Sequence, residues 1–167
     1  MKKNEVVVDT DILSMFAKAH ALDALIQAFR FLKPVITPAI RAEITVPLQY
    51  GFTFPWDVLQ HFETVELPQE SMKMYMRFLE RFTPVGRGEL EAVAYCRETG
   101  ALFSTNDRKA REFALNQGIN VVSLQAILRS LWEVHGWTKG DVQRLLERLQ
   151  KADRLLVSEE VRSEIFD

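Results

Sequence analysis

Short apolar runs of the buried-strand type alternate with helical stretches along most of this chain. The first run, the valines at 6–8, ends at Asp9 and is followed by apolar residues at helical spacing over 12–29. Further strands are predicted at 33–37, 64–67, 101–105 and 120–123, with helices between them. Strands and helices in alternation form βαβ units, whose strands are parallel. The sequence therefore predicts an α/β fold around a mainly parallel sheet.

Prolines, glycines and N-cap residues mark where several of the helices begin and end. Thr37 is a suitable N-cap and Pro38 fits a first turn, so a helix is expected to begin there. A second helix is expected over 69–82, with its Met-containing apolar stripe facing the core. The segment GELEAVAYCRET predicts a third helix, which Gly100 ends.

The stretch 47–56 interrupts this pattern. Two prolines enclose a glycine there, which predicts a loop. The loop carries the aromatic residues Tyr50, Phe52, Phe54 and Trp56. Packing against the domain or a second subunit is the simpler role for these rings, and stacking on unpaired bases is the alternative.

After Ser123 the chain is helical, with helices expected up to His135 and over about 139–152, then a polar amphipathic tail. A length of 167 residues with 47% apolar content is enough for one well-formed core and short for two. We therefore expect a single domain over residues 1–167. The aromatic loop and the amphipathic tail make a homodimer the expected assembly.

Composition points to a reducing compartment and away from membranes. The single cysteine, Cys96, excludes an intrachain disulfide and a multi-cysteine zinc site. The sequence does not begin with a signal-peptide core, and no run approaches the roughly 18 apolar residues that span a bilayer. We therefore expect a soluble cytoplasmic protein. The net charge of −2 gives no sign of non-specific nucleic-acid binding, although a local basic rim is compatible with it.

Four segments that are far apart in the chain each place a carboxylate at the end of a predicted strand or in a helix. The segments are VVVDTDIL, TPAIRAEI, GRGELEAVAYC and FSTNDRKAR, and their acids are Asp9, Asp11, Glu43, Glu89, Glu91 and Asp107. The carboxyl ends of parallel strands share one edge of a sheet, where open α/β folds bind ligands. Acids that converge there repel one another unless a cation neutralises them, and all-oxygen ligand sets suit Mg²⁺ or Mn²⁺. These ions commonly serve phosphodiester hydrolysis, so the set predicts a metal-dependent nuclease.

Each acid also has a simpler explanation, because acids at helix N-termini are ordinary caps. Asp9 ends an apolar strand, where an unpartnered charge is costly, so a functional role is favoured for it. Asp11 is either a second ligand or a cap, and capping is the better explanation. Glu43 lies inside its helix and Asp107 at a strand-to-helix junction, so the case for these two rests on the whole set.

Glu89 and Glu91 compete for one place in this site. Two residues apart on a helix, they point roughly 200° from each other and cannot share one ion comfortably. Glu91, which precedes the small Ala92 and the apolar Val93, is expected to face the site. Glu89 is expected to favour the helix dipole from solvent.

Three basic residues, Arg108, Lys109 and Arg111, follow Asp107 on the same predicted helix. Together they could supply the basic rim that a phosphate backbone needs. A solvated helix face is the simpler explanation for any one of them.

The four acidic motifs, in this order over about residues 4–125, resemble those of the PIN domain family, metal-dependent ribonucleases that include many prokaryotic toxin components. The resemblance implies a three-layer α/β/α fold with a helical C-terminal extension over about 126–167. Carried over motif by motif, the family's catalytic and metal-binding acids fall on Asp9, Glu43, Glu91 and Asp107, with Mg²⁺ or Mn²⁺ as the cofactor. Asp11, which stands where the family often has Asn or Ser, is a further candidate ligand.

Supporting roles follow for Thr105 and Glu89, and Arg108 and Arg111 are candidate substrate contacts. The resemblance implies RNA as the substrate and, for a toxin, an antitoxin protein as the partner. Two other classes stay open. A catalytically silent PIN-like scaffold would keep the acids for folding and use the aromatic loop and helical tail for protein contacts. A receiver-like phospho-acceptor domain would need a lysine on a late strand, and the sequence lacks a clear one.

Overall fold

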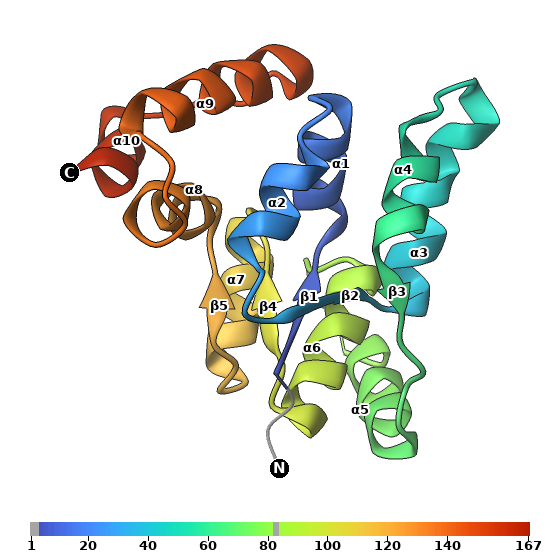
Figure 1. Ribbon diagram of the computed structural model, residues 1–167. Helices are drawn as coiled ribbons and strands as arrows, with labels where there is room; N and C mark the ends of the chain where they lie inside the picture. Colours follow the sequence, from blue (N-terminus) through green and yellow to red (C-terminus); the bar gives the residue numbers. More distant parts are fainter. Residues whose placement is uncertain (1–3, 82–83) are drawn as a thin grey trace.

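β1, Glu5–Val8, lies at the centre of a parallel β-sheet (Figure 1). The computed structural model describes residues 4–81 and 84–167, and within them the sheet has five strands. The other strands are β2 (Lys33–Ile36), β3 (Glu63–Thr64), β4 (Leu102–Ser104) and β5 (Val121–Val122), in the order β3-β2-β1-β4-β5. The valines of β1 are fully buried, as expected for a parallel sheet covered on both faces. The predicted α/β class is confirmed.

Helices connect the strands and cover the sheet. Between β1 and β2 lie α1 (Thr10–Lys18) and α2 (Leu22–Ala28), and between β2 and β3 lie α3 (Pro38–Thr45), the 3₁₀ helix η1 (Val46–Tyr50) and α4 (Phe54–His61). α5 (Gln69–Leu79) and α6 (Arg87–Thr99) precede β4, and α7 (Arg108–Asn116) joins β4 to β5. α8 (Leu124–Glu133), α9 (Lys139–Asp153) and α10 (Glu159–Phe166) form the C-terminal extension. In the described part of the chain, no helix is both long and apolar enough to cross a membrane.

The prediction of a loop over 47–56 is wrong, because two helical elements lie there. η1 and α4 cover most of the stretch, with Pro47 and Pro55 in their first turns. Proline has no N–H to donate and its φ suits a first turn, so each proline begins a helical segment instead of breaking one. Gly51, in the left-handed region at φ 85°, makes the break between them.

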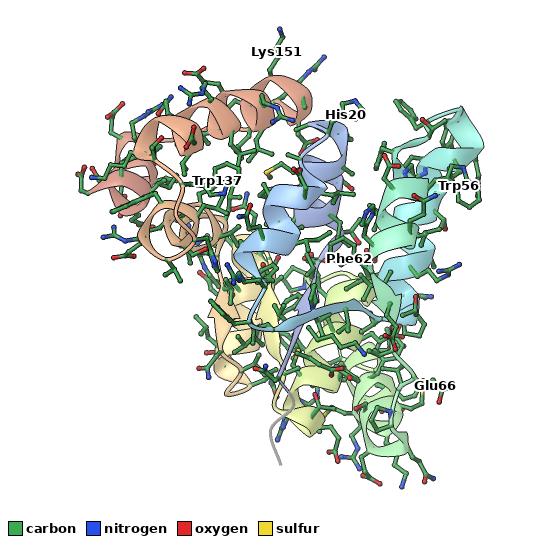
Figure 2. The ribbon with its side chains drawn as sticks, in the orientation of Figure 1. His20, Trp56, Phe62, Glu66, Trp137 and Lys151 are labelled. Carbon is green, nitrogen blue, oxygen red and sulfur yellow. The ribbon has the colours of Figure 1, made fainter. Side chains whose placement is uncertain are left out.

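Most aromatic side chains of this arm, which consists of α3, η1 and α4, are exposed. Tyr50 is 74% exposed, and Phe52 and Trp56 are each 56% exposed. Trp56 lies on the outer side of the arm (Figure 2). Phe54 is half-buried and contacts Phe52 edge to face. Packing within the domain therefore accounts for Phe54 and leaves the other three rings to solvent or a partner.

The methionine stripe of α5 faces solvent, which contradicts the expected core role. Met72 and Met76 are exposed, while Phe78, on the other side of the helix, is buried. Both faces of this helix are apolar, so periodicity alone did not identify the one that packs on α6. The helix ends at Leu79, and the end expected at 82 lies outside the described residues.

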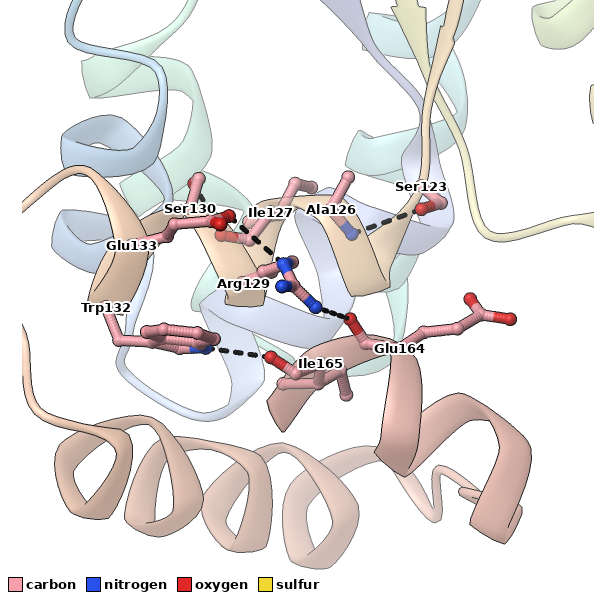
Figure 3. A network of polar contacts seen from close by, with 9 residues as sticks. All are labelled: Ser123, Ala126, Ile127, Arg129, Ser130, Trp132, Glu133, Glu164 and Ile165. Atoms are coloured by element: carbon pink, nitrogen blue, oxygen red, sulfur yellow. Dashed lines mark hydrogen bonds and ion pairs between the residues drawn. The ribbon is translucent and has the colours of Figure 1, made fainter. Parts of the chain in front are cut away.

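The C-terminal extension closes on itself at the end of α10 (Figure 3). The indole N–H of Trp132 donates to the carbonyl oxygen of Ile165 at 2.8 Å, and Arg129 donates to that of Glu164 at 3.1 Å. Carbonyl groups in the last turn of a helix have no intrahelical donor. Two side chains of α8 therefore satisfy the C-terminal end of α10.

α9 fastens this extension to the core at α1. Arg148 Nη2 donates to the carbonyl oxygens of Ala19 and His20, at 2.7 and 2.9 Å. His20 has a left-handed backbone, φ 53°, and lies at the end of α1 beside α9 (Figure 2). One arginine thus satisfies the carbonyl groups that follow α1 and joins the two parts of the chain.

Candidate functional site

The N-termini of four helices meet at the carboxyl edge of the sheet. β1 leads into α1 through Asp9, β2 into α3 through Thr37, and β4 into α7 through residues 105–107. α6 reaches the same edge because the backbone N–H of Gly88, in its first turn, donates to Glu43 Oε1 at 3.0 Å. The four acidic motifs therefore converge, although they are far apart in the sequence.

Asp9 is buried at the centre of this edge, with 2% of its surface exposed. It is the N-cap of α1, and its Oδ1 accepts a hydrogen bond from the backbone N–H of Thr10 at 2.8 Å. Its Oδ2 accepts from the hydroxyl of Thr105 at 2.7 Å. The Thr105 oxygen in turn accepts from the backbone N–H of Asp107 at 3.1 Å, so this threonine orients one acid and fixes the segment that carries another.

Asp11 and the segment that carries Asp107 contact each other beside this centre. Asp11 Oδ1 accepts from the backbone N–H of Ile12 at 2.8 Å, and its Oδ2 accepts from that of Asn106 at 3.2 Å. Asp11 therefore holds the β4–α7 connection against α1, although Asp9, and not Asp11, is the N-cap. Asp107 is exposed and caps α7 through the N–H of Ala110, at 2.8 Å from its Oδ1.

Glu89 is the α6 glutamate that lies beside Asp9. Their side chains are joined by a hydrogen bond. Such a bond forms only when one of the two acids is protonated, and the nearby Glu89 contributes to the raised pKa of Asp9. Glu89 Oε2 also accepts from the backbone N–H of Gly86 at 2.9 Å, which caps α6. The expected capping role is present, but the side chain is half-buried against the acidic cluster, not directed to solvent.

Glu43 and Glu91 exchange caps between α3 and α6. Glu91 Oε1, on α6, accepts from the backbone N–H of Ala39 in the first turn of α3, at 2.7 Å. Glu43, on α3, accepts from Gly88 of α6 and, through Oε2, from the hydroxyl of Thr10 at 2.7 Å. Glu91 was expected to face the site, but it is buried and its carboxylate is bound to the start of α3. The structure brings Glu43 and Glu89 toward Asp9 and holds Glu91 on this helix cap.

Gly88 leaves the space that Glu43 occupies. A Cβ atom on Gly88 would lie 2.5 to 2.7 Å from the carboxylate atoms of Glu43. Any larger residue would therefore displace that carboxylate. Gly88 is thus required because the Glu43 carboxylate approaches its Cα closely, and not only because a helix starts there.

The acids of this edge raise one another's pKa. Burial raises the pKa of Asp9 well above its usual range, and the nearby Asp11 and Glu89 raise it further. Burial raises the pKa of Asp11 to about 6, with contributions from Glu89 and Asp107. The pKa of Glu89 is raised by burial, then by Asp107 and Glu43. The influences that lower these pKa values are hydrogen bonds and not neighbouring cations, so the negative charge is left largely uncompensated.

The chemistry of this donor set fits a divalent cation. Its donors are carboxylate oxygens, which suit Mg²⁺ and Mn²⁺, and a cation beside Asp9 and Glu89 would relieve the repulsion from neighbouring acids that raises their pKa values. Across residues 4–81 and 84–167, no three acidic, histidine or cysteine side chains already surround one ion position. The carboxylates instead bind helix N–H groups and hydroxyls. Loading an ion would therefore require some of these side chains to turn.

The expected basic rim lies on α7, directly after Asp107. Arg108 pairs with Glu112 at 3.0 Å, and 82% of its side chain is exposed. Lys109 is exposed, and Arg111 is half-buried. These side chains are accessible beside the acidic cluster, and a surface pair such as Arg108 with Glu112 contributes little to stability.

This architecture defines an open parallel α/β domain whose acids gather where strands end and helices begin. The family model for DUF3368, a PIN domain, matches residues 5–167, so the chain belongs to the PIN domain family. The PIN domain is a nuclease-type fold, and its members usually use divalent metals. The match continues through the C-terminal helices, beyond the segment on which the sequence motifs lie.

A solved structure shows the same fold. It is a PilT N-terminus domain protein, SSO1118, from the hyperthermophilic archaeon Sulfolobus solfataricus P2, with a TM-score of 0.52 and 18% identity. The comparison covers 80% of this chain and 98% of that chain. At this identity the likeness concerns the fold alone. No curated protein matches the sequence.

Sequence reasoning did not single out three residues that hold the site together. Thr10 donates its hydroxyl hydrogen to Glu43, the backbone of Asn106 binds Asp11, and Gly88 makes room for Glu43. The first two stand next to acids in their motifs. A short polar residue beside a strand-end acid is therefore the signal that could have found Thr10 and Asn106.

Proposed function

We propose that this protein is a metal-dependent ribonuclease that hydrolyses RNA phosphodiester bonds with Mg²⁺ or Mn²⁺. The observation that carries the proposal is the buried carboxylate of Asp9 beside the half-buried Glu89, with Asp11, Glu43 and Asp107 around them. Such a group of acids is costly to a fold unless it serves to bind positive charge. Membership of the PIN domain family supports both the nuclease class and the use of a divalent metal.

The proposed ligands are Asp9, Asp11, Glu43, Glu89 and Asp107. When bound, the metal ion would supply activation of water for in-line attack and stabilisation of charge on the phosphate oxygens. The Thr105 hydroxyl and the Thr10 N–H orient Asp9, so this carboxylate would keep its direction when a cation binds. The negative charge of these acids would attract the ion.

Substrate contacts are proposed for the side chains beside the acids. Arg108 and Arg111 on α7 would bind phosphate groups of the backbone, since guanidinium groups pair well with phosphate. RNA is the proposed substrate on the strength of the PIN domain resemblance. The exposed arm, with Tyr50, Phe52 and Trp56, is a candidate surface for a second copy or for unpaired bases.

Cleavage of a fluorescent single-stranded RNA, with a DNA of the same sequence as a comparison, tests the proposed activity. The wild type should cleave RNA with Mg²⁺ or Mn²⁺ and not with EDTA, and Asp9→Asn should lose activity. Glu98→Gln, which removes an exposed acid on α6, is the matched control and should keep full activity. Equal cleavage by wild type and Asp9→Asn would show a contaminating nuclease and remove the support for this proposal.

A role as the toxin of a toxin–antitoxin pair, with a homodimeric assembly, extends the proposal. An antitoxin would place a basic residue near the acids of the site, because the negative charge there lacks compensation. Growth inhibition on expression, relieved by Asp9→Asn, is expected for a toxin, and unimpaired growth would contradict that role. Light scattering should give twice the monomer mass, and a monomer at high concentration would contradict the dimer.

A catalytically silent PIN-like scaffold is the second candidate function. The observation that favours it is that Asp107, Glu43 and Glu91 already cap helix N-termini. A scaffold would not bind Mn²⁺ and would not cleave RNA. The two candidates therefore differ in the first metal titration.

A further inference from the structure

The two glutamates of α6 have different partners although they are two residues apart. Glu89 contacts Asp9, whereas Glu91 is bound to Ala39 of α3 and only 5% exposed. We propose that Glu91 is a positioning residue that holds Glu43 in place, while Glu89 stays the proposed ligand on α6. This assignment rests on the proposed metal-dependent function and names the role of each acid in it.

Glu91 replaces the missing N-cap of α3. Thr37 occupies the N-cap position, yet its side chain makes no capping hydrogen bond. Within the described structure its buried hydroxyl oxygen has no partner. The carboxylate of Glu91 takes the Ala39 N–H instead, and an ionised acceptor at a helix N-terminus is stronger than a neutral hydroxyl. Turning Glu91 toward a cation would leave the start of α3 without a side-chain cap.

The bond from Ala39 to Glu91 also fixes Glu43. Ala39 and Glu43 are four residues apart on α3 and so lie on one face of it, and Gly88 and Glu91 are three apart on α6. Two hydrogen bonds, from Ala39 to Glu91 and from Gly88 to Glu43, therefore join the facing sides of the two helices in a closed ring. The bond from Ala39 to Glu91 sets the rotation of α3 against α6. The bond from Gly88 to Glu43 depends on that rotation.

The fit at Gly88 makes Glu43 sensitive to this rotation. The Glu43 carboxylate lies so close to the Cα of Gly88 that a methyl group there would have no room. A small turn of α3 would therefore move the carboxylate away from Gly88 and from the hydroxyl of Thr10. Glu91 can thus influence the site without contacting the cation.

Three variants separate a positioning role from a ligand role. Glu91→Gln keeps an oxygen that accepts from Ala39 but removes the charge, and Glu91→Met removes the acceptor while keeping the length of the side chain. Glu89→Gln is the matched variant on the same helix, because its amide oxygen can still accept from Gly86. A positioning residue tolerates the glutamine, whereas a ligand does not.

The first readout is amide hydrogen exchange of the metal-free protein. Glu91→Gln should keep the protection of Ala39 and Gly88 within about threefold of the wild type, whereas Glu91→Met should speed exchange of both by about tenfold or more, as expected for the loss of a charge-assisted bond. Unchanged protection of Gly88 in Glu91→Met would overturn the proposal, because Glu43 would then be held without Glu91.

The second readout is the affinity for Mn²⁺ measured by calorimetry. Glu89→Gln and Glu91→Met should weaken binding by about tenfold or more, while Glu91→Gln stays within about threefold of the wild type. A loss in Glu91→Gln equal to that in Glu89→Gln would show that Glu91 is a ligand and overturn the assignment. A wild type that binds no Mn²⁺ would overturn the assignment of Glu89 and the proposed function, and the exchange data would still decide whether Glu91 positions Glu43.

Discussion

Replacing Asp11 by asparagine should stabilise the metal-free protein at neutral pH. Burial and neighbouring acids raise the pKa of Asp11 from its usual 3.8 to about 6. Two pKa units correspond to about 3 kcal/mol of unfavourable interaction in the charged form. Asparagine removes the charge, and its oxygen can still accept from the N–H of Ile12. Its NH₂ group cannot accept from the N–H of Asn106, and the loss of that bond offsets about 1 kcal/mol of the gain. The net expectation is a gain of about 1–2 kcal/mol in the free energy of unfolding.

The gain should depend on pH. The folded state binds the Asp11 proton more tightly than the unfolded state does, since its pKa is raised when folded. Binding of this proton therefore stabilises the folded wild type. The contribution is fully present below the unfolded pKa of 3.8 and is lost as the pH rises through about 6. Asparagine does not titrate, so the variant should have its full advantage above about pH 6 and little near pH 4.

Urea unfolding with EDTA at pH 4.0 and at pH 7.5 measures this difference directly. Thermal unfolding at pH 7.5 should show a rise of about 2–8 °C in Tm for a chain of this size. Glu98→Gln removes an exposed acid on α6 and should leave the free energy of unfolding unchanged within about 0.5 kcal/mol. A variant that is less stable than the wild type at pH 7.5, or an advantage that is the same at both pH values, would refute the reasoning.

Three further substitutions test two contacts that hold the acids of the site and one that holds the C-terminal extension. Gly88→Ala should cost about 1–3 kcal/mol in urea unfolding, because its Cβ would lie 2.5 to 2.7 Å from the Glu43 carboxylate, and a neutral result would contradict the close fit. Thr105→Val removes the hydroxyl that binds Asp9 at 2.7 Å and should cost about 1–3 kcal/mol in the same assay, so equal stability would remove its supporting role. Arg148→Ala should lower stability by about 1–3 kcal/mol, since it leaves two carbonyl groups after α1 without a donor, and an unchanged Tm would show that the extension does not depend on this contact.

The strand framework was predictable because its signals are local. The valines of β1 end at Asp9, and β2, β4 and β5 are each followed within three residues by the N-cap of a helix. Parallel pairing then brings the strand ends to one edge without further information. The convergence of the acidic motifs followed from this topology.

The direction of individual side chains was not predictable, because it depends on contacts between distant segments. Ala92 and Val93 favoured Glu91 as the glutamate that faces the site, but apolar neighbours do not say what a buried side chain contacts. Its partner, Ala39, is 52 residues away in the sequence. The same limit explains why Glu89, which looked like a solvent-facing cap, lies beside Asp9.

The prolines and methionines show a second limit. Pro47 and Pro55 suggest a loop in the sequence, but both lie in the first turn of a helical segment, where proline is also common. The α5 helix has two apolar faces, and only its packing on α6 selects Phe78 over Met72 and Met76. Local sequence predicts the α5 helix but not the face of it that packs on α6. It does not predict the helical segments that begin at the two prolines.

A calorimetric titration of Mn²⁺ into the wild type and into Asp9→Asn tests the central claim most directly. Asparagine can accept from the Thr10 N–H as Asp9 does, so the variant should fold, and circular dichroism would confirm it. We predict that the wild type binds Mn²⁺ and that Asp9→Asn does not. Binding should release protons, because the pKa values of Asp9, Asp11 and Glu89 are raised in the metal-free protein. A wild type that binds no Mn²⁺ would contradict the account and make the acidic edge a set of helix caps.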